Sequence, residues 1–430
     1  MKKRSTLAMI AAASVATLGF VAAPAHAVDQ VTIYGGFTGP QAQQFQQELD
    51  TWGAKNNIKA TFTTLASFDT DIRVKVKAGQ SPDIAIWPQP GGLLDYTSVL
   101  EPLNKVLGAA GLKAVTSTLV PGWANLATKG GMTYGLPVSA NVKSLVWYNP
   151  AAFKAAHLTV PKTDAQLTAL SKKILAKKLG YPWCVGIESG GATGWAATDW
   201  LEEYVLRYGG AAQYQAWYKG KLKFNSPLVI KAGNKVTQMI LSKGAVNGGG
   251  KAIAATNFGN TASLFANDKS KCFMMRQGSF ITAFFPDAIQ KEFNAGNFTH
   301  VGVFKLPAPA GAHDAVLGGG DIAAAFNTNA ATAKVMSFIL SDKLGQMGNI
   351  ATYPSYLSAH RTFPSSLYTS PILKTIATTL ATAKLFGFDG SDQEPAVVNA
   401  TEWKELTNWI AGKESMKQAF DKIDKSWSQA

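Results

Sequence analysis

Aromatic residues stand beside amide, carboxylate and guanidinium residues at the ends of several apolar segments of this sequence. Trp87 closes one such segment and is followed by Gln89, and Glu188 closes another shortly before Trp195. An aromatic ring can stack on the apolar face of a sugar while neighbouring polar groups pair with its hydroxyls. Core packing would explain each tryptophan alone, but their shared position after predicted strands favours a site for a polyhydroxylated ligand. Further candidates of this kind are Ser189, Arg276, Gln277, Ser279, Tyr353 and Asp389.

A run of glycines precedes another predicted strand. Gly318, Gly319 and Gly320 lead into Asp321. A dinucleotide-binding motif should follow a strand and open a helix, so the run does not fit that function. Because glycine has no Cβ atom, a ligand could still approach this backbone closely. We therefore count Gly319, Gly320 and Asp321 among the candidate ligand-binding residues.

Motifs for metal, nucleophilic and nucleotide chemistry are missing from the sequence. It contains no H-E-x-x-H, C-x-x-C or G-x-S-x-G pattern. The glycine-rich segment 243–251 has the wrong spacing for a phosphate-binding loop, and Ala252 replaces its magnesium-binding hydroxyl. We therefore expect no metal and no cofactor. A carboxylate pair for glycoside hydrolysis stays open as an alternative, with the candidates Glu188, Asp199, Asp321, Asp389 and Asp392.

Cys184 and Cys272 are the only cysteines. In an oxidising compartment two cysteines more often form a bridge than stay free. We therefore predict a disulfide between them, with two buried thiols as the alternative.

The pattern of apolar residues predicts strands that alternate with helices. Strands are expected at 31–34, 58–62, 83–87, 145–148, 181–187, 272–275, 301–304 and 321–326. Helices are expected from Pro40, around 72–76, from a capping box formed by Thr163 and Gln166, and after Thr198. Strands separated by helices indicate parallel pairing in α/β sheets, and the plainest arrangement is two lobes.

Length and composition narrow the class of protein further. The chain has 430 residues, of which 47% are hydrophobic and 16% charged, so it can form packed cores and is not disordered. A basic start, an apolar stretch and Ala25-His26-Ala27 predict a signal peptide over residues 1–27. No later uncharged apolar run is long enough to span a bilayer. The protein is therefore expected to be exported.

A net charge of +14 at pH 7 raises the question of nucleic-acid binding. Lys172, Lys173, Lys177 and Lys178 lie opposite apolar positions of one predicted helix, which is the pattern of a solvated helix face. Nucleic-acid binding would need basic residues interleaved with aromatics on one stripe. We expect no nucleic-acid partner and instead a weak attraction to an anionic cell envelope.

Six segments spread over nearly the whole chain carry a resemblance to a known family. They are DIAIW at 83–87, GLPVSANVKSLVWYN at 135–149, PWCVGIES at 182–189, TDW at 198–200, RQGSF at 276–280 and FDGSD at 388–392, followed by Trp403 and Trp409. These segments resemble the extracellular solute-binding proteins of sugar ABC transporters, the family containing maltose-binding protein, and within it the α-glucoside-binding branch.

The resemblance implies a two-lobed α/β fold of the periplasmic-binding-protein type, with hinge crossovers and a ligand cleft between the lobes. Lobe one would comprise residues 28–140 and 309–352, and lobe two residues 141–308 and 353–430. The family's stacking, polar and acidic ligand contacts would fall on Trp87, Asn141, Glu188, Trp195, Phe280 and Tyr353.

The function expected from this resemblance is a non-enzymatic receptor. It would capture an α-glucoside or a short oligosaccharide by closing its lobes and deliver the sugar to an ABC transporter permease. We expect a monomer located in the periplasm or the extracellular cell-envelope space. The alternative is a secreted carbohydrate-active enzyme, which would need two carboxylates flanking one glycosidic bond.

Overall fold

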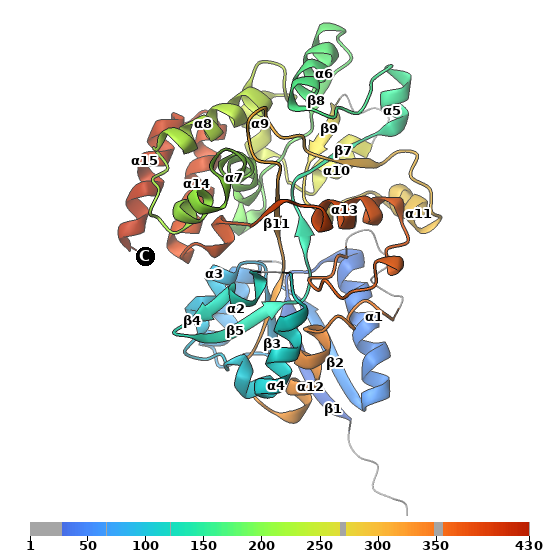
Figure 1. The fold of residues 1–430 in the computed structure, drawn as a ribbon, viewed down its shortest axis with the longest axis vertical. Coiled ribbons are helices and arrows are strands. Elements are labelled where there is room, and N and C mark those ends of the chain that lie inside the picture. The colour runs from blue at the N-terminus through green and yellow to red at the C-terminus, as the bar shows by residue number, and fades with distance from the viewer. Residues whose placement is uncertain (1–27, 66, 121, 267–271, 348–355, 430) are drawn as a thin grey trace, which may run out of the picture.

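Two α/β lobes joined by a small crossover sheet form the protein. The computed structural model describes residues 28–65, 67–120, 122–266, 272–347 and 356–429, and Figure 1 shows lobe one below lobe two. The expected α/β class with two lobes is confirmed. The predicted signal peptide and Tyr353 lie outside the described residues. None of the described helices is long and apolar enough to cross a membrane.

A six-stranded sheet forms the centre of lobe one. The edge strand β2 pairs in parallel with β1, and β1 pairs in parallel with β3, whereas β12 runs antiparallel to both β3 and β5. Strand β3 is buried along its whole length, which explains its uninterrupted apolar sequence. In sheet order the strands are β2 (Ile58–Thr64), β1 (Asp29–Gly35), β3 (Ile84–Trp87), β12 (Ile322–Ala325), β5 (Met132–Pro137) and β4 (Ala127–Lys129). Its helices are α1 (Gly39–Asn56), α2 (Phe68–Lys77), α3 (Pro90–Leu93), α4 (Leu103–Thr118) and α12 (Ala330–Ile339).

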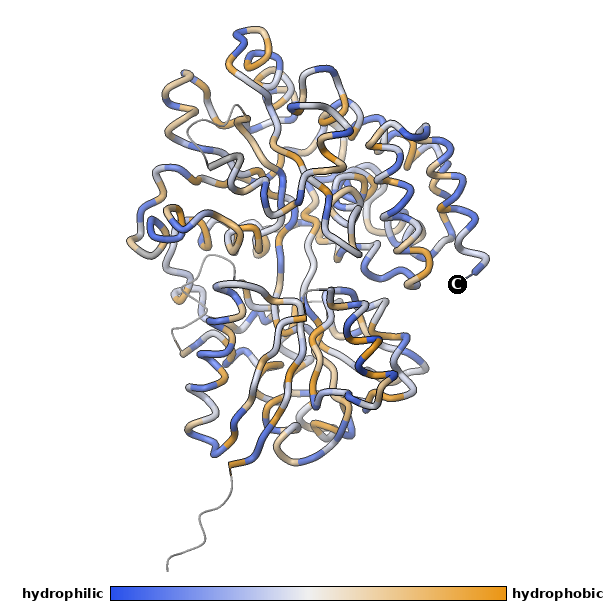
Figure 2. The backbone as a smooth tube through the Cα atoms, turned by 180° about the vertical axis from the view of Figure 1, so that it is seen from behind, coloured by the Kyte–Doolittle hydropathy of each residue, from blue (hydrophilic) through white to orange (hydrophobic). Residues whose placement is uncertain are grey.

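Lobe two contains a four-stranded mixed sheet and most of the helices. Its strands, in sheet order, are β10 (Gly302–Lys305), β7 (Leu145–Tyr148), β9 (Cys272–Arg276) and β8 (Tyr181–Trp183). Its helices are α5 (Pro150–Ala155), α6 (Asp164–Ala176), α7 (Trp195–Tyr218), α8 (Pro227–Val236), α9 (Gly249–Ala255), α10 (Asn260–Ala266), α11 (Asp287–Asn294), α13 (Pro371–Ala381), α14 (Ala396–Ile410) and α15 (Met416–Ser426). Figure 2 shows hydrophobic segments concentrated in the interiors of both lobes.

The crossover sheet moves two of the expected lobe boundaries. It contains β13 (Leu385–Phe388), β11 (Ala315–Gly319) and β6 (Asn141–Val142). Strand β11, which we expected in lobe one, packs against α7 of lobe two. Conversely, Leu357 and Arg361, expected in lobe two, form backbone hydrogen bonds with Ala140 and Thr118 of lobe one. Lobe assignment depends on these long-range contacts, which no local pattern contains.

Two predicted elements differ from the structure. The strand expected at 181–187 ends at Trp183, because the amides of Cys184 and Ile187 donate to different segments, at Met274 and Ile253. Helix α7 begins at Trp195 rather than after Thr198, whose hydroxyl donates back to the Trp195 carbonyl at 2.7 Å. A local sequence pattern does not reveal to which backbone carbonyl a threonine hydroxyl will donate its hydrogen bond.

Candidate ligand-binding site

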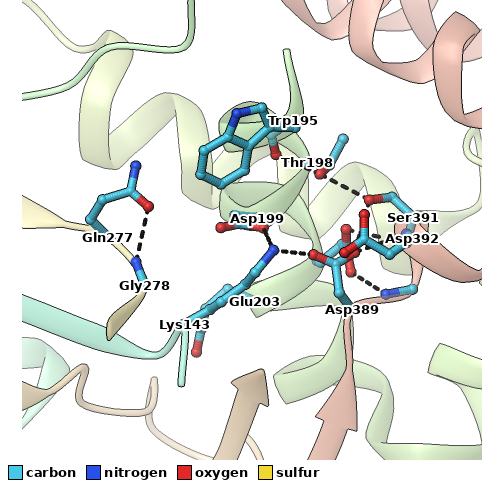
Figure 3. A network of polar contacts seen from close by, with 12 residues as sticks. Lys143, Trp195, Thr198, Asp199, Glu203, Gln277, Gly278, Asp389, Ser391 and Asp392 are labelled. Atoms are coloured by element: carbon cyan, nitrogen blue, oxygen red, sulfur yellow. Dashed lines mark hydrogen bonds and ion pairs between the residues drawn. The ribbon is translucent and has the colours of Figure 1, made fainter. Parts of the chain in front are cut away.

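A buried lysine lies at the junction between the crossover and lobe two. Lys143 follows β6, and its Nζ donates to Oδ1 of Asp199 on α7 at 2.9 Å and to Oδ2 of Asp389 after β13. Figure 3 shows the ammonium group between these two carboxylates. All three side chains are at least nine-tenths buried. The cluster therefore joins the crossover segment, α7 and the segment after β13.

A second ion cluster lies deeper in lobe two, around Glu203 of α7. Its carboxylate accepts hydrogen bonds from Arg276 at 2.7 Å, from Arg207 at 2.6 Å and from the Ser144 hydroxyl at 2.8 Å. The guanidinium of Arg276 also lies 5.3 Å from the centre of the Trp200 ring. Arg276 is thus engaged within the protein and 4% exposed, which corrects the expectation that it contacts a ligand.

Charge pairing sets the protonation of the Lys143 cluster. Burial alone would lower the pKa of Lys143, but Asp199 and Asp389 outweigh it and raise that pKa well above its usual value. Burial raises the pKa of Asp199 to about 6 although Lys143 opposes the shift. For Asp389, burial is the largest single influence and would raise the pKa, but Lys143 and the hydrogen bonds from Asp392 and Glu202 together lower it. At neutral pH the lysine and Asp389 are therefore both charged and form a buried ion pair.

The ring of Trp195 lies over this charged cluster. Its ring is half-buried and meets the rings of Phe258 and Phe280 edge-on, at centroid distances of 4.9 and 5.6 Å. The Lys143 ammonium lies 5.3 Å from the Trp195 ring centre. Gly194, with φ of 115°, precedes the ring, and a Cβ atom there would come within 2.2 Å of the Trp403 carbonyl oxygen. Glycine is therefore required to bring Trp195 to this position.

Half-exposed polar groups accompany the Trp195 ring. The Glu188 carboxylate accepts hydrogen bonds from the Gly190 amide at 2.6 Å and from the Asn257 side chain at 2.7 Å. These bonds lower the pKa of Glu188, so it is ionised at neutral pH and acts as a hydrogen-bond acceptor. Asn141 on β6 adds an amide, whose oxygen lies 3.4 Å from the Ser279 hydroxyl.

Lobe one approaches the same region through α2 and α3. Asp69 on α2 lies near enough to Asp392 of lobe two to contribute to the raised pKa of Asp392, after burial and Asp389. In α3, a Cβ atom on Gly91 would come within 2.2 Å of the Glu394 carbonyl oxygen. The backbones of the two lobes therefore touch at Gly91, beside the carboxylate-bearing loop.

An acidic pair lies buried behind this loop. Burial and the proximity of Glu402 raise the pKa of Glu394 well above its usual value. Burial raises the pKa of Glu402 to about 8. Protonated carboxyl groups tolerate burial far better than carboxylates, so Glu394 can occupy a position otherwise suited to an apolar residue.

The candidate ligand residues from the sequence fall into two groups. Half-exposed in the structure are Gln89, Asn141, Glu188, Ser189, Trp195, Phe280 and Asp321. Buried are Trp87, Arg276, Gln277, Ser279, Gly319, Gly320 and Asp389. In this conformation only the half-exposed group offers surface to a ligand.

Trp87 illustrates the correction most clearly. It is 1% exposed and packs against Phe68, Tyr96 and Phe326, with ring centroids between 5.6 and 6.0 Å away. The position after a strand is as expected, but the ring points into the core of lobe one. We therefore no longer assign it a stacking role.

The glycine run after β11 also has an internal explanation. Cβ atoms on Gly318 and Gly320 would come within 2.4 Å of the Asn141 oxygen and 2.3 Å of the Ser139 oxygen. The close approach predicted for a ligand is thus made by the chain itself, at the crossover. Asp321 accepts a hydrogen bond from the Ser139 hydroxyl at 2.7 Å, and burial raises its pKa to about 6.

The sequence analysis missed Lys143 and Asp69. Lys143 lies inside the matched segment 135–149, so its place at the crossover was a usable signal, but an isolated lysine reads as a surface residue. Asp69 carried no signal, because only the approach of α2 to lobe two gives it a neighbour there. Together, an aromatic ring, acceptor carboxylates and an amide can hold a polyhydroxylated molecule without reacting with it.

The chain is similar to known proteins over most of its length. The family model for bacterial extracellular solute-binding protein matches residues 38–343. The osmoprotective compounds-binding protein GgtB of Synechocystis sp. is 32% identical over 402 residues, covering 93% of this chain and 92% of that protein. The alpha-glucosides-binding periplasmic protein AglE of Rhizobium meliloti is 30% identical over 405 residues, covering 92% and 86%. A solved chitin oligosaccharide binding protein shares the fold, with a TM-score of 0.75, 19% identity and coverage of 93% and 98%.

Proposed function

Because the chain belongs to the bacterial extracellular solute-binding proteins, we propose that it is the receptor of an ABC importer for an α-glucoside or a short oligosaccharide. The half-exposed ring of Trp195, flanked by Glu188 and Asn141 where the lobes approach, carries this proposal. The relative named for α-glucosides supports the choice of sugar. The protein acts as a monomer in the periplasm or cell-envelope space and passes its sugar to a permease.

Trp195→Ala should weaken sugar binding about ten- to thirtyfold. If a glucosyl ring covers about 50–80 Å² of the indole, about 25 cal/mol per Å² gives roughly 1.3–2 kcal/mol. Calorimetry with maltose, sucrose, trehalose and maltotriose should first identify the bound sugar and then measure this change. Trp52→Ala is the matched control, since Trp52 is half-buried but stacks on Phe338, 4.8 Å away in lobe one. If folded Trp195→Ala protein bound the sugar with unaltered affinity, Trp195 would not be a ligand contact.

Gly91→Ala should prevent the lobes from closing fully. Its Cβ atom would lie 2.2 Å from the Glu394 carbonyl oxygen, whereas one on Gly92 would meet only the Gln89 Cβ atom at 3.9 Å. Small-angle scattering should show that saturating sugar reduces the radius of gyration of the wild type and of Gly92→Ala, but not of Gly91→Ala. If the closed form falls to about a tenth of its population, apparent affinity falls about tenfold. If sugar reduced the radius of gyration equally in all three proteins, the contact between Gly91 and Glu394 would not limit lobe closure.

The hydrolase alternative gains no support from the site. Asp199 and Asp389 are engaged by Lys143, and the Glu188 carboxylate by the Gly190 amide and Asn257. The homologous proteins are named for binding rather than for cleavage. The wild type should therefore return its bound sugar uncleaved after prolonged incubation, as chromatography would show. Release of more than one equivalent of glucose per protein would contradict the proposal that the protein is a non-enzymatic receptor.

A further inference from the structure

We propose that the outer end of lobe two binds the surface of an anionic lipid membrane through a lysine patch. The patch brings together residues from α5, from α6 and the residues just before and after it, and from the segment before α9. Its members, all exposed, are Lys154, Lys162, Lys172, Lys173, Lys177, Lys178 and Lys243. Figure 1 places α6 at the end of lobe two that is farthest from lobe one.

The positive charge of the protein is concentrated in lobe two. Residues 141–319 and 364–430 contain 27 lysines and arginines against 17 aspartates and glutamates, whereas residues 28–140 and 320–363 contain 11 against 10. Several carboxylates of lobe two, among them Asp199, Glu202 and Glu203, are buried. The exposed surface of lobe two is therefore more positive than its composition indicates.

Within the patch almost no negative charge opposes the lysines. Residues 149–181 contain six lysines and one carboxylate, Asp164. Asp164 is already paired with Lys235 of α8 at 2.8 Å. Among the described residues, none of the seven patch lysines forms an ion pair, and Lys173 donates only to the His157 carbonyl, at 3.0 Å. Their charges thus remain available to an external anion.

Tertiary contacts assemble the patch around an exposed leucine. Leu175 of α6 is 36% exposed, and its side chain lies beside Gly244, the neighbour of Lys243. The bond between Lys173 and His157 similarly holds the end of α5 against α6. The result is an exposed aliphatic side chain on the lysine-bearing helix α6, beside the segment that carries Lys243.

This chemistry favours a lipid surface over a specific anion site. All the charges are flexible lysines, without the arginine forks that bind one phosphate in a defined geometry. A lysine near an anionic leaflet contributes a favourable diffuse attraction, and an aliphatic group can enter the boundary of headgroups and acyl chains. If this end bound the membrane, the region where the two lobes meet would stay accessible to a ligand, because it lies at the opposite end of lobe two.

Flotation with lipid vesicles tests the proposal. At low salt, wild-type protein should bind phosphatidylcholine vesicles that contain phosphatidylglycerol but not vesicles of pure phosphatidylcholine. At high salt it should bind neither kind of vesicle. The variant K172Q/K173Q/K177Q/K178Q should bind about six-hundredfold more weakly, at roughly fivefold per lysine. The control K55Q/K59Q/K77Q/K113Q removes the same charge from exposed lysines of lobe one and should bind like the wild type.

Three results would overturn the proposal. They are absence of wild-type binding to the anionic vesicles, equal losses in both quadruple variants, and unchanged vesicle binding by Leu175→Ser. If Leu175→Ser binds the vesicles like the wild type and the protein also binds inorganic polyphosphate, the patch would be a site for soluble polyanions instead. Sugar affinity and melting temperature of each variant are measured in parallel, so a failure of the proposed receptor function would be recognised separately.

Discussion

Replacing Lys143 with methionine should lower the free energy of unfolding by about 3–5 kcal/mol, the usual cost of removing one partner from a buried ion pair. The variant would leave Asp199 and Asp389 buried beside each other without the ammonium group that now lies between them. Without Lys143 the folded-state pKa of both carboxyls would rise, so the variant would lose stability as pH increases. Urea denaturation should therefore show a larger deficit at pH 7 than at pH 4.5.

Lys235→Met is the matched control for this prediction. Lys235 is also a buried lysine, but within the described part of the chain it pairs with a single carboxylate, that of Asp164, which is 16% exposed. Its loss should cost about 1 kcal/mol. Adding Asp389→Asn to Lys143→Met should recover part of the lost stability, because one buried charge disappears. The electrostatic role of Lys143 would be contradicted if Lys143→Met lost less free energy of unfolding than Lys235→Met. It would also be contradicted if that loss did not depend on pH.

Removing the disulfide should have an effect of similar size. Cys184 and Cys272 are bonded, with Cα atoms 5.5 Å apart and a sequence separation of 88 residues. The chain-entropy model assigns about 4–5 kcal/mol to a bridge that closes a loop of this length. Cys184→Ala/Cys272→Ala should therefore denature at a distinctly lower urea concentration than the oxidised wild type.

The reductant provides the control for the disulfide. A phosphine reductant should lower the denaturation midpoint of the wild type towards that of the double variant and should leave the variant unchanged. Mass spectrometry of unreduced wild type should show no free thiol. Two free thiols, or equal midpoints for oxidised wild type and variant, would contradict a stabilising bridge.

Local patterns predicted most strands and helices correctly. Strands β1, β3 and β7 lie where the apolar runs placed them. The end of β8 was misplaced because its hydrogen-bond partners are distant in sequence. The start of α7 was misplaced because Thr198 donates to the Trp195 carbonyl inside the helix instead of capping its first turn. Thr163 does cap α6, but the Gln166 side chain bonds to Lys162 rather than completing the capping box.

The site was harder to predict, because position after a strand does not determine which way a side chain points. Trp87 and Trp195 read alike in the sequence, yet Trp87 packs into the core of lobe one and Trp195 is half-exposed. Asp389 was selected as a ligand residue but lies 0% exposed against Lys143. In each case the decisive neighbour belongs to another segment of the chain.

The sequence by itself determined the α/β class and the two-lobed family fold, since these follow from apolar periodicity and extended matched segments. It also limited any disulfide to one possible pair, although two buried thiols stayed open as the alternative until the structure placed the two cysteines together. Only the tertiary structure decided which polar groups are exposed, which are neutralised internally and where the lobes touch. Lys143 shows the physical reason. Its environment is made by Asp199 and Asp389, 56 and 246 residues away in the chain, and burial and charge pairing of this kind arise only when distant segments pack together.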